Sequence, residues 1–295
     1  MKNELKYYYN LTPNDIYNNN NIYKFSYNNN YYALIELQNI DNIEYLYKLS
    51  IDLNNNGIYT HQIILNNYNK IVTNINNKNY TLIKSIEEYN KKVTLNDIVY
   101  FSNITSNIIN MKKINWHQLW CDKMDYFEYQ VDELKKRYPI IKESFKYFSG
   151  IVETGISLLI NEKYNNYSLS ICHSRINKEM TLFDLYNPLN FMIDIKIRDI
   201  CEYFKKENLD NNTYNEIINY LNYNNLTDDE IKLFFIRMLY PSFYFDLYEK
   251  IILNNENENT IYKALDRIDN YELIIKKIYI FIKKIYIFPE VEWLN

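Results

Sequence analysis

The feature that most restricts the fold of this chain is a change in the spacing of its apolar residues near residue 93. Before this point, short runs rich in aromatic and β-branched residues alternate with Asn-rich breaks, which is typical of β-strands joined by tight turns. After it, apolar residues recur at intervals of three and four, which is typical of amphipathic helices. The 295-residue chain therefore predicts an α+β fold. We expect a small β-containing domain at residues 1–90 and a larger helical domain at 91–295.

The first part predicts a β-hairpin, a helix and three further strands. Ile22–Tyr27 and Tyr31–Leu37 are the expected hairpin strands, and Asn28-Asn29-Asn30 between them provides the turn. Asp41 is the expected cap of a helix that ends near Gly57. The later strands are expected at His61–Leu65, Ile71–Asn74 and Tyr80–Ser85.

Composition explains why few glycines mark these turns. The chain has 33 Tyr but only 3 Gly and 5 Pro, and its Asn, Lys, Ile, Tyr and Phe residues all have AT-rich codons, so genome composition accounts for the bias. Asn adopts left-handed backbone more easily than other residues that carry a side chain. We therefore expect Asn to form turns where another protein would use Gly.

Charge, cysteine content and hydropathy argue against several classes of protein. A net charge of −4 and a pI near 5.6 give no basic surface, which disfavours binding to nucleic acid. The three cysteines are odd in number and lack metal-ligand spacing, which predicts reduced thiols in the cytoplasm. No apolar signal core opens the chain, and no run reaches the ~18 apolar residues that a transmembrane segment needs.

The second part predicts a succession of helices. The helix expected at Asn115–Tyr138 carries an apolar stripe that includes Trp116 and Trp120, which we interpret as core packing, and Pro139 ends it. Further helices are expected at Ser144–Ile160, Asp199–Lys206, Thr213–Tyr223, Asp228–Tyr240 with Thr227 or Asp228 as cap, Ser242–Leu253 and Ile261–Ile287.

The last of these helices has a basic face. Lys276, Lys277, Lys283 and Lys284 recur at heptad spacing, opposite an apolar face. A basic amphipathic helix can lie on a membrane surface. We favour packing of its apolar face on its own domain, because that is the more common role of a terminal helix.

A stretch between these helices carries the residues of chemical interest: Ile171-Cys172-His173-Ser174-Arg175-Ile176, Phe183-Asp184-Leu185 and Ile197-Arg198-Asp199-Ile200-Cys201-Glu202. It resembles the catalytic centre of kinase-like proteins related to aminoglycoside and choline phosphotransferases. In that fold a His-x-Asp loop supplies the base, an Asn five residues after the Asp binds Mg²⁺, and a later Asp binds a second metal site. Here His173 fits the His, but Arg175 stands at the base position and Met180 at the Asn position. An arginine cannot accept a proton at any working pH.

Separated pieces of the chain occur in a recognisable order: Trp116-His-Gln-Leu-Trp120 with Asp125-Tyr126, Glu143–Gly150, Ile171-Cys172-His173, Pro188 with Asp194, Arg198–Glu202, and Leu239-Tyr240-Pro241. Together they resemble the spore-coat kinase-like family of the CotS and YutH type, over roughly residues 20–290. The resemblance implies a bilobal, protein-kinase-like fold of the aminoglycoside phosphotransferase type, with a small β-rich N-lobe that has one helix and a larger helical C-lobe. It also implies a link to the spore coat or to sporulation.

Two acids compete for the role of the metal-binding Asp. Asp184 follows Leu182-Phe183 as if an apolar strand ended in an acid, but its distance from His173 is short for a catalytic loop and a hairpin. Asp194 is the other candidate. For both residues, a solvated or helix-capping carboxylate is the alternative interpretation.

The remaining members of the stretch have structural interpretations. We interpret His173 as a buried structural residue and expect the Asp199 carboxylate to reach it, or the N–H groups near it, because buried carboxylates need such partners. Arg175 has two interpretations: an ion-pair partner of Asp184 or Asp194 inside a disused cleft, or an exposed loop residue.

The N-terminal part lacks the groups that grip a nucleotide in active kinases, namely a strand lysine and a Gly-rich loop. The strand expected to carry the lysine, Ala33–Gln38, has Glu36 instead, and no glycine precedes Gly57. Lys24 and Lys48 are the residues that could substitute from neighbouring elements.

The hypothesis that we prefer is a catalytically inactive kinase-like protein, a pseudokinase, that needs no cofactor and acts through protein partners such as spore-coat proteins. It would reside in the cytoplasm or the spore coat. The alternative is an atypical small-molecule phosphotransferase that depends on ATP and Mg²⁺, with Asp184 or Asp194 as the metal ligand. A third interpretation is an interaction domain with no tie to sporulation.

Overall fold

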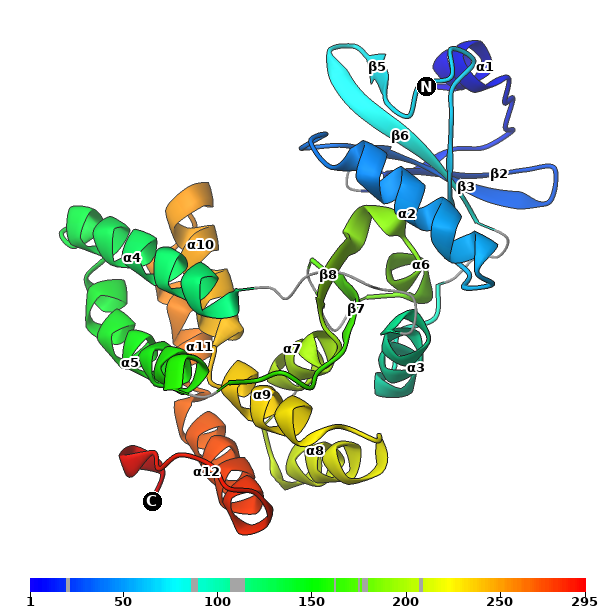
Figure 1. Cartoon of the computed structure of the whole chain (residues 1–295). Helices are drawn as coiled ribbons and strands as arrows, with labels where there is room; N and C mark the ends of the chain where they lie inside the picture. The colour runs from blue at the N-terminus through cyan, green and yellow to red at the C-terminus, as the bar shows by residue number, and fades with distance from the viewer. Residues whose placement is uncertain are drawn as a thin grey trace. The chain divides into compact units, whose positions relative to one another are not determined.

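The computed structural model describes residues 1–19, 22–85, 90–106, 115–161, 163–174, 176, 180–206 and 209–295 (Figure 1). The chain forms two compact units, which we describe one at a time. Unit 1 contains Met1–Asn107, His173–Arg175 and Glu179–Met192, and unit 2 contains Ile108–Cys172, Ile176–Lys178 and Ile193–Asn295. The domain boundary expected at residues 90 and 91 stays a prediction.

Unit 1 is built on an antiparallel sheet that has six strands within the described residues. The strand order is β1-β2-β3-β6-β4, and β5 pairs with β6. The strands are β1 (Tyr17–Asn19), β2 (Ile22–Tyr27), β3 (Asn30–Glu36), β4 (Gln62–Ile64), β5 (Thr73–Ile75) and β6 (Lys78–Ser85). The predicted hairpin and the three later strands are therefore confirmed, with ends that differ by at most two residues.

The turns of unit 1 use Asn in left-handed backbone, as the composition predicts. The β2–β3 turn has Asn28 at φ 48° and Asn29 at φ 58°, and the β5–β6 turn has Asn76 at φ 50° and Asn77 at φ 63°. Two consecutive residues with positive φ match the right-handed twist of a hairpin. In the described part of the chain, the residues with positive φ are Gly57 and eight asparagines: Asn10, Asn28, Asn29, Asn69, Asn76, Asn77, Asn225 and Asn255.

One face of the sheet is covered by the N-terminal helix α1 (Lys2–Tyr9). Leu5 and Tyr9 of this helix share a buried cluster with Phe25, Leu34 and Leu82 of the sheet. Cross-strand pairing places Leu34 opposite Leu82, so both side chains point to this face. Burial of these apolar side chains is what holds α1 on the sheet.

Helix α2 (Ile43–Asn55) follows β3 and contacts β4. The expectation that Asp41 caps this helix is wrong, because the cap position is Asn42 and it makes no side-chain cap bond. The chain beyond Gly57 is fixed by His61, whose N–H donates to the Tyr186 carbonyl at 2.9 Å. Unit 1 also contains α3 (Leu95–Ser106), α6 (Leu182–Leu185) and the 3₁₀ turn η1 (Pro188–Asn190).

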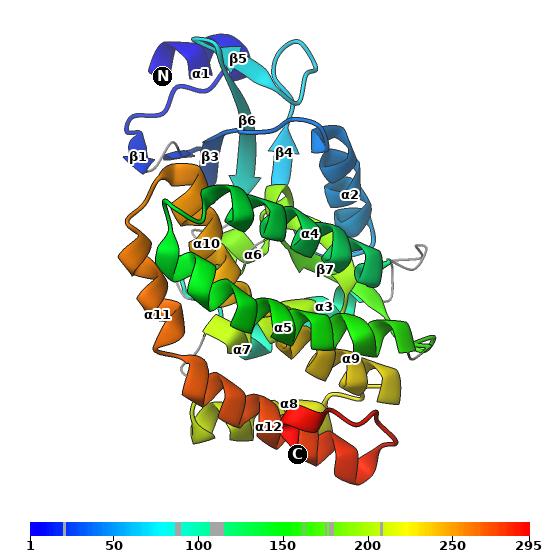
Figure 2. The same ribbon diagram turned by 90° about the vertical axis from the view of Figure 1, so that its left-hand side faces the viewer.

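Unit 2 is mainly helical. Its longer helices are α4 (Trp116–Leu134), α5 (Pro139–Asn161), α7 (Arg198–Lys206), α8 (Asn211–Tyr223), α9 (Asp228–Met238), α10 (Ser242–Asn254) and α12 (Ile268–Ile285). The short elements are η2 (Glu258–Ile261), α11 (Tyr262–Leu265) and η3 (Glu292–Leu294). Helix α4 contacts α5, α5 contacts α9, and α9 contacts α12, so these four helices succeed one another through the unit (Figure 2).

Helix ends in unit 2 follow local chemistry. Thr227, one of the two residues predicted as cap, is the N-cap of α9 and forms a capping box with Glu230: the Glu230 N–H donates to Thr227 Oγ1 and the Thr227 N–H donates to Glu230 Oε2. Pro139 begins α5, because its fixed φ suits the first position of a helix. The preceding helix α4 therefore ends earlier than expected, at Leu134.

The single helix expected at Ile261–Ile287 is divided into η2, α11 and α12. The chain bends between α11 and α12, where Arg267 Nη2 donates to the Lys205 carbonyl at 2.6 Å. A contact with a residue 62 positions away leaves no periodic signal in the sequence.

The strands β7 (Leu169–His173) and β8 (Phe191–Ile195) form a two-stranded sheet whose residues are divided between the two units. Sheet-containing and mainly helical units together confirm the predicted α+β class. Of the helices in the described ranges, none has both the length and the apolar character needed to cross a bilayer.

Candidate functional site

His173 ends strand β7 and is buried in unit 1. Its Nε2 atom lies 2.9 Å from the Leu185 carbonyl oxygen, and the rings of Phe101 and Phe191 lie within 5.7 Å and 5.6 Å of its own. A ring enclosed by aromatic side chains and tied to a backbone carbonyl supports the polypeptide around it. The geometry agrees with our structural interpretation of this residue.

The kinase resemblance marks two further positions, one for a metal ligand and one for the base. The first holds an apolar residue, and the second lies outside the described residues. Met180 is buried, and its carbonyl accepts the Val93 N–H at 3.0 Å. A thioether side chain is a poor ligand for Mg²⁺, which prefers oxygen. Arg175 lies outside the described residues, so both interpretations of it stay predictions.

The expectation that Asp184 ends a strand is wrong, because residues 182–185 form the short helix α6. The Asp184 carboxylate accepts the Thr181 N–H at 2.8 Å and the Thr181 hydroxyl at 2.9 Å. These bonds satisfy donors at the start of the helix. Asp184 is thus a capping carboxylate, which is the alternative role that the sequence allows for it.

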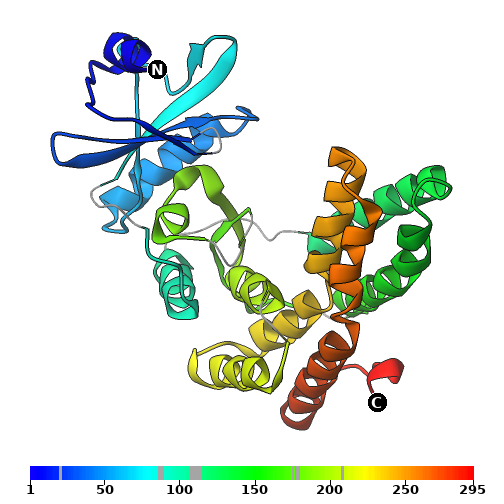
Figure 3. The ribbon, with the colours of Figure 1, turned by 180° about the vertical axis from the view of Figure 1, so that it is seen from behind.

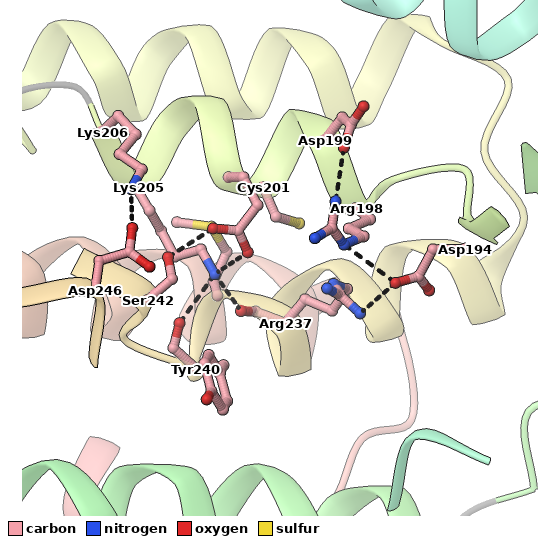
Figure 4. Close-up of polar contacts among 12 residues, drawn as sticks. Asp194, Arg198, Asp199, Cys201, Lys205, Lys206, Arg237, Tyr240, Ser242 and Asp246 are labelled. Carbon is pink, nitrogen blue, oxygen red and sulfur yellow. Dashed lines mark hydrogen bonds and ion pairs between the residues drawn. The ribbon is translucent and has the colours of Figure 1, made fainter. Parts of the chain in front are cut away.

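Asp194 lies in β8, is buried, and is surrounded by N–H groups of unit 2 (Figure 4). Its Oδ1 atom accepts the Trp116 indole N–H at 2.7 Å and the Ile195 N–H at 2.7 Å. Its Oδ2 atom is 3.2 Å from Arg198 Nε and 3.5 Å from Arg237 Nη1. A carboxylate has about four lone-pair positions, and four nitrogen atoms surround this one.

Asp199 is the second residue of α7 and is buried beside Arg198. Its Oδ1 atom lies 3.0 Å from Arg198 Nη1, so Arg198 bridges the carboxylates of Asp194 and Asp199. Burial alone would lower the pKa of Arg198, but attraction to Asp199, Glu202 and Asp194 outweighs it and raises that pKa. The expected contact between Asp199 and His173 stays a prediction.

A second buried network lies at the other end of α7 (Figure 4). The Lys205 ammonium donates to Glu202 Oε1 at 2.7 Å and to the carbonyls of Arg237 and Tyr240 at 3.2 Å and 2.9 Å. Ser242 donates its hydroxyl to Glu202 Oε2 at 2.6 Å. The cation binds one carbonyl in the last turn of α9 and one just beyond it, groups that the helix cannot pair itself.

Burial sets the protonation properties of this pair. Burial lowers the pKa of the Lys205 ammonium. For Glu202, burial would raise the pKa, but attraction to Lys205, Arg198 and Arg237 outweighs it and lowers the pKa to about 2.

Sequence reasoning missed both networks in part. Arg198, Glu202 and Lys205 are spaced by four and three residues, so a shared face of α7 could have been predicted from their positions. Arg237 had no such signal, because its partner Asp194 lies far away in the chain. The hydrogen bond of Trp116 was also missed, since we interpreted this residue as packing alone.

Unit 1 contains a pocket of about 350 Å³ beside its sheet. Lys24, Tyr32, Ala33 and Phe183 are among the residues that line it, and Lys24 Nζ lies 5.0 Å from the centre of the Phe183 ring. Of the two lysines that the sequence offers, Lys24 is thus at a pocket, whereas Lys48 is exposed on α2. Glu36 of β3 pairs with Lys78 at 2.9 Å.

Comparison with solved structures shows an aminoglycoside phosphotransferase-like fold. An aminoglycoside phosphotransferase from Alicyclobacillus acidocaldarius superimposes with a TM-score of 0.64 at 9% identity, covering 92% of this chain and 93% of that one. A spectinomycin phosphotransferase in its AMP-bound complex superimposes with a TM-score of 0.61 at 14% identity, covering 93% of this chain and 96% of that one. The predicted fold class is confirmed.

Comparison of sequences gives the family. The model of the family described as "Spore coat putative kinase YutH" matches residues 2–278. The endospore coat-associated protein YutH of Bacillus subtilis (strain 168) is 23% identical over 207 residues, which are 61% of this chain and 61% of that protein. The match thus spans about three fifths of the length of this curated relative.

We expect strong coupling between Asp194 and Arg237. Arg237→Met leaves a buried carboxylate with one guanidinium fewer, and we expect it to lower the free energy of unfolding by about 3 kcal/mol. Asp194→Asn removes the charge that Arg237 neutralises. The loss in free energy of unfolding in the double variant should therefore be about 1–2 kcal/mol smaller than the sum of the losses in the two single variants. Urea denaturation of the four proteins measures this difference.

Arg137→Met is the matched control. Arg137 is exposed just beyond the end of α4, so its replacement should lower the free energy of unfolding by less than about 0.5 kcal/mol. Additive effects of Arg237→Met and Asp194→Asn would contradict the ion pair.

We expect Glu202 to make stability depend on pH in the acid range. The pKa of this carboxyl is lowered from 4.5 to about 2, so the carboxylate stabilises the fold above pH 4.5, and that contribution is lost as the pH falls to about 2. The loss should amount to about 3 kcal/mol. In Glu202→Gln the decrease over this interval should be smaller by that amount, as measured by urea denaturation at a series of pH values. Glu216→Gln, at an exposed position of α8, should keep the wild-type profile; the same profile in Glu202→Gln would refute the assignment.

Proposed function

Because this chain belongs to the family described as "Spore coat putative kinase YutH", we propose that it is a kinase-fold protein without phosphotransferase activity that acts through protein contacts in the spore coat. The observation that carries the catalytic half of this proposal is the saturation of Asp194. The family and the coat-associated relative support the half that concerns the spore coat.

Phosphoryl transfer needs a carboxylate that is available to a metal ion. Mg²⁺ requires short, near-octahedral contacts with oxygen and gives up its water reluctantly. Here Arg198 and Arg237 supply the positive charge that a metal would bring to Asp194, and Trp116 and the Ile195 N–H take the remaining positions. As placed, the site does not fit Mg²⁺, and we derive no catalytic step through one.

The other candidate acid supports the same proposal. Both bonds to Thr181 involve Oδ2 of Asp184, and they hold that carboxylate at the start of α6. At the positions that the kinase resemblance marks for the base and for a metal ligand, the sequence has Arg175 and Met180. Neither side chain can take the role that its position has in an active enzyme.

One observation favours the competing function, an atypical phosphotransferase that depends on ATP and Mg²⁺. The pocket of unit 1 is large enough for part of a small ligand, and Lys24 could bind an anionic group there. A bound nucleotide would not by itself restore catalysis, because Asp194 would still be neutralised by arginine.

Thermal unfolding with ATP separates the two functions. A ligand that binds the native state raises the melting temperature. We expect Mg²⁺ to add no rise to that seen with ATP alone, and no phosphate to be transferred to a panel of hydroxyl compounds that includes aminoglycosides. A rise that requires Mg²⁺, together with transfer to one of these compounds, would establish the competing function instead.

Lys24→Met and Lys48→Met form a matched pair for this measurement. If ATP alone stabilises the protein, Lys24→Met should remove the effect and Lys48→Met should keep it, since Lys24 lines the pocket and Lys48 is exposed.

We expect the protein to be made during sporulation and to be recovered in coat extracts of purified spores. Immunodetection of the full-length chain in vegetative cells, mother-cell lysate and spore-coat extract measures its distribution. Equal amounts in growing and sporulating cells, with none in the coat extract, would favour an interaction domain with no tie to sporulation. A cytoplasmic protein of known location serves as the fractionation control.

A further inference from the structure

Helix α4 presents an acidic face that nothing within the described residues neutralises fully. Its exposed carboxylates are Asp122, Asp125, Glu128, Asp132 and Glu133. Among these, Asp132 pairs with Lys135 at 2.6 Å, while no cation in the described part of the chain pairs with the other four. We call these five residues the α4 acidic face.

Exposed apolar side chains lie among these carboxylates and along one edge of them. Leu119, Tyr126 and Tyr129 are between 54% and 65% exposed, although they are large. At 100° per residue, Tyr129 projects directly opposite the buried residue Trp120, whereas Leu119 and Tyr126 lie at one edge of the exposed side, about 100° and 120° from it. An exposed apolar seam with charges of one sign along it is typical of a helix that binds another helix.

Helix α12 presents the opposite charge. Lys276, Lys277, Lys283 and Lys284 lie on its outer side, and we call them the α12 basic face. They flank Leu273 and Ile280, which repeat every seven residues with Ile287 just beyond the helix, and these three side chains are between 40% and 95% exposed. Lys283 pairs with Glu290 at 3.3 Å and Lys277 donates to Asn211, so part of the charge is already engaged.

The two faces are separated within the molecule. Helices α5 and α9 lie between α4 and α12, which occupy opposite ends of unit 2 in each view (Figures 1, 2 and 3). With 19 and 18 residues, the two helices are each about 28 Å long, so they can pair along their full length. The pairing must therefore join different molecules.

We propose that the α4 acidic face of one molecule binds the α12 basic face of a second copy of this chain, so that copies associate head to tail. Leu119 and Tyr126, seven residues apart, would meet the heptad of Leu273 and Ile280, and the carboxylates would flank the lysines as at the edges of a coiled coil. Such an interface uses two different surfaces of each molecule, so it extends into a chain of copies or closes into a ring.

Charge decides between this arrangement and its competitors. Pairing of α4 with α4, or of α12 with α12, would place like charges together and is disfavoured. Complementary charge makes the heterologous pairing favourable and sensitive to salt. The inference deepens the interaction half of the proposed function and is independent of the state of Asp194.

Two charge-reversed variants of the full chain test the proposal. Variant A carries Asp122→Lys, Asp125→Lys and Glu133→Lys, and variant B carries Lys276→Glu, Lys277→Glu and Lys284→Glu. In A both faces are basic and in B both are acidic, so neither should associate alone. Mixed together, every α4 face can meet an α12 face of opposite charge, so an alternating assembly should form.

Sedimentation velocity over a range of concentrations measures association. We expect wild type to assemble at about 50 mM salt and to dissociate at about 500 mM. Variants A and B should each need a protein concentration at least about tenfold higher than wild type to associate. The equimolar mixture should associate at the same concentration as wild type. A control that reverses the exposed residues Lys142, Lys146 and Lys250 should assemble as wild type does.

Thermal unfolding of each variant confirms that it is folded before it is scored. A wild type that stays monomeric at low salt, or folded variants that assemble alone as wild type does, would overturn the proposal. So would a folded mixture of A and B that remains monomeric. Monomeric wild type that binds vesicles of anionic phospholipid through the α12 lysines would overturn it in favour of a lipid partner. None of these outcomes changes the expected response to ATP and Mg²⁺, so failure here is distinct from failure of the proposed lack of catalysis.

Discussion

The carboxylate of Asp194 is the group on which the organisation of unit 2 depends. Trp116 of α4, Arg198 of α7 and Arg237 of α9 all converge on it. A buried carboxylate is tolerated only when its charge and its lone pairs are compensated. The three elements are therefore held together by the requirement of one acid on β8.

Helix α7 connects this carboxylate with the second polar network. Its first residue, Arg198, binds Asp194, and Lys205 near its other end binds Glu202 and the last carbonyls of α9. Arg237 belongs to both networks, through its guanidinium at one and its carbonyl at the other. Positive groups thus neutralise a buried acid and cap a helix end in the same region. The ion pairs and the shape of the helical unit are parts of one arrangement.

Local signals in the sequence predicted local structure well. The β2–β3 hairpin and the cap of α9 at Thr227, one of two residues predicted for it, follow from residues close together in the chain, and both are confirmed. Signals that depend on distant partners were lost. Arg237 was not selected, because only the fold brings it to Asp194. The family resemblance identified the fold, but not the groups that neutralise its acid.

The asparagines with left-handed backbone affect how turns are predicted from the sequence of such a chain. In the described residues Gly57 is accompanied by eight asparagines with positive φ, so glycine content badly underestimates the tight corners of the backbone. Asparagine is the side-chain-bearing residue best suited to these corners. Mutational pressure toward A and T can therefore remove glycine codons from a gene while the path of the polypeptide is preserved. In chains of this composition, a search for tight turns must therefore weigh asparagine beside glycine.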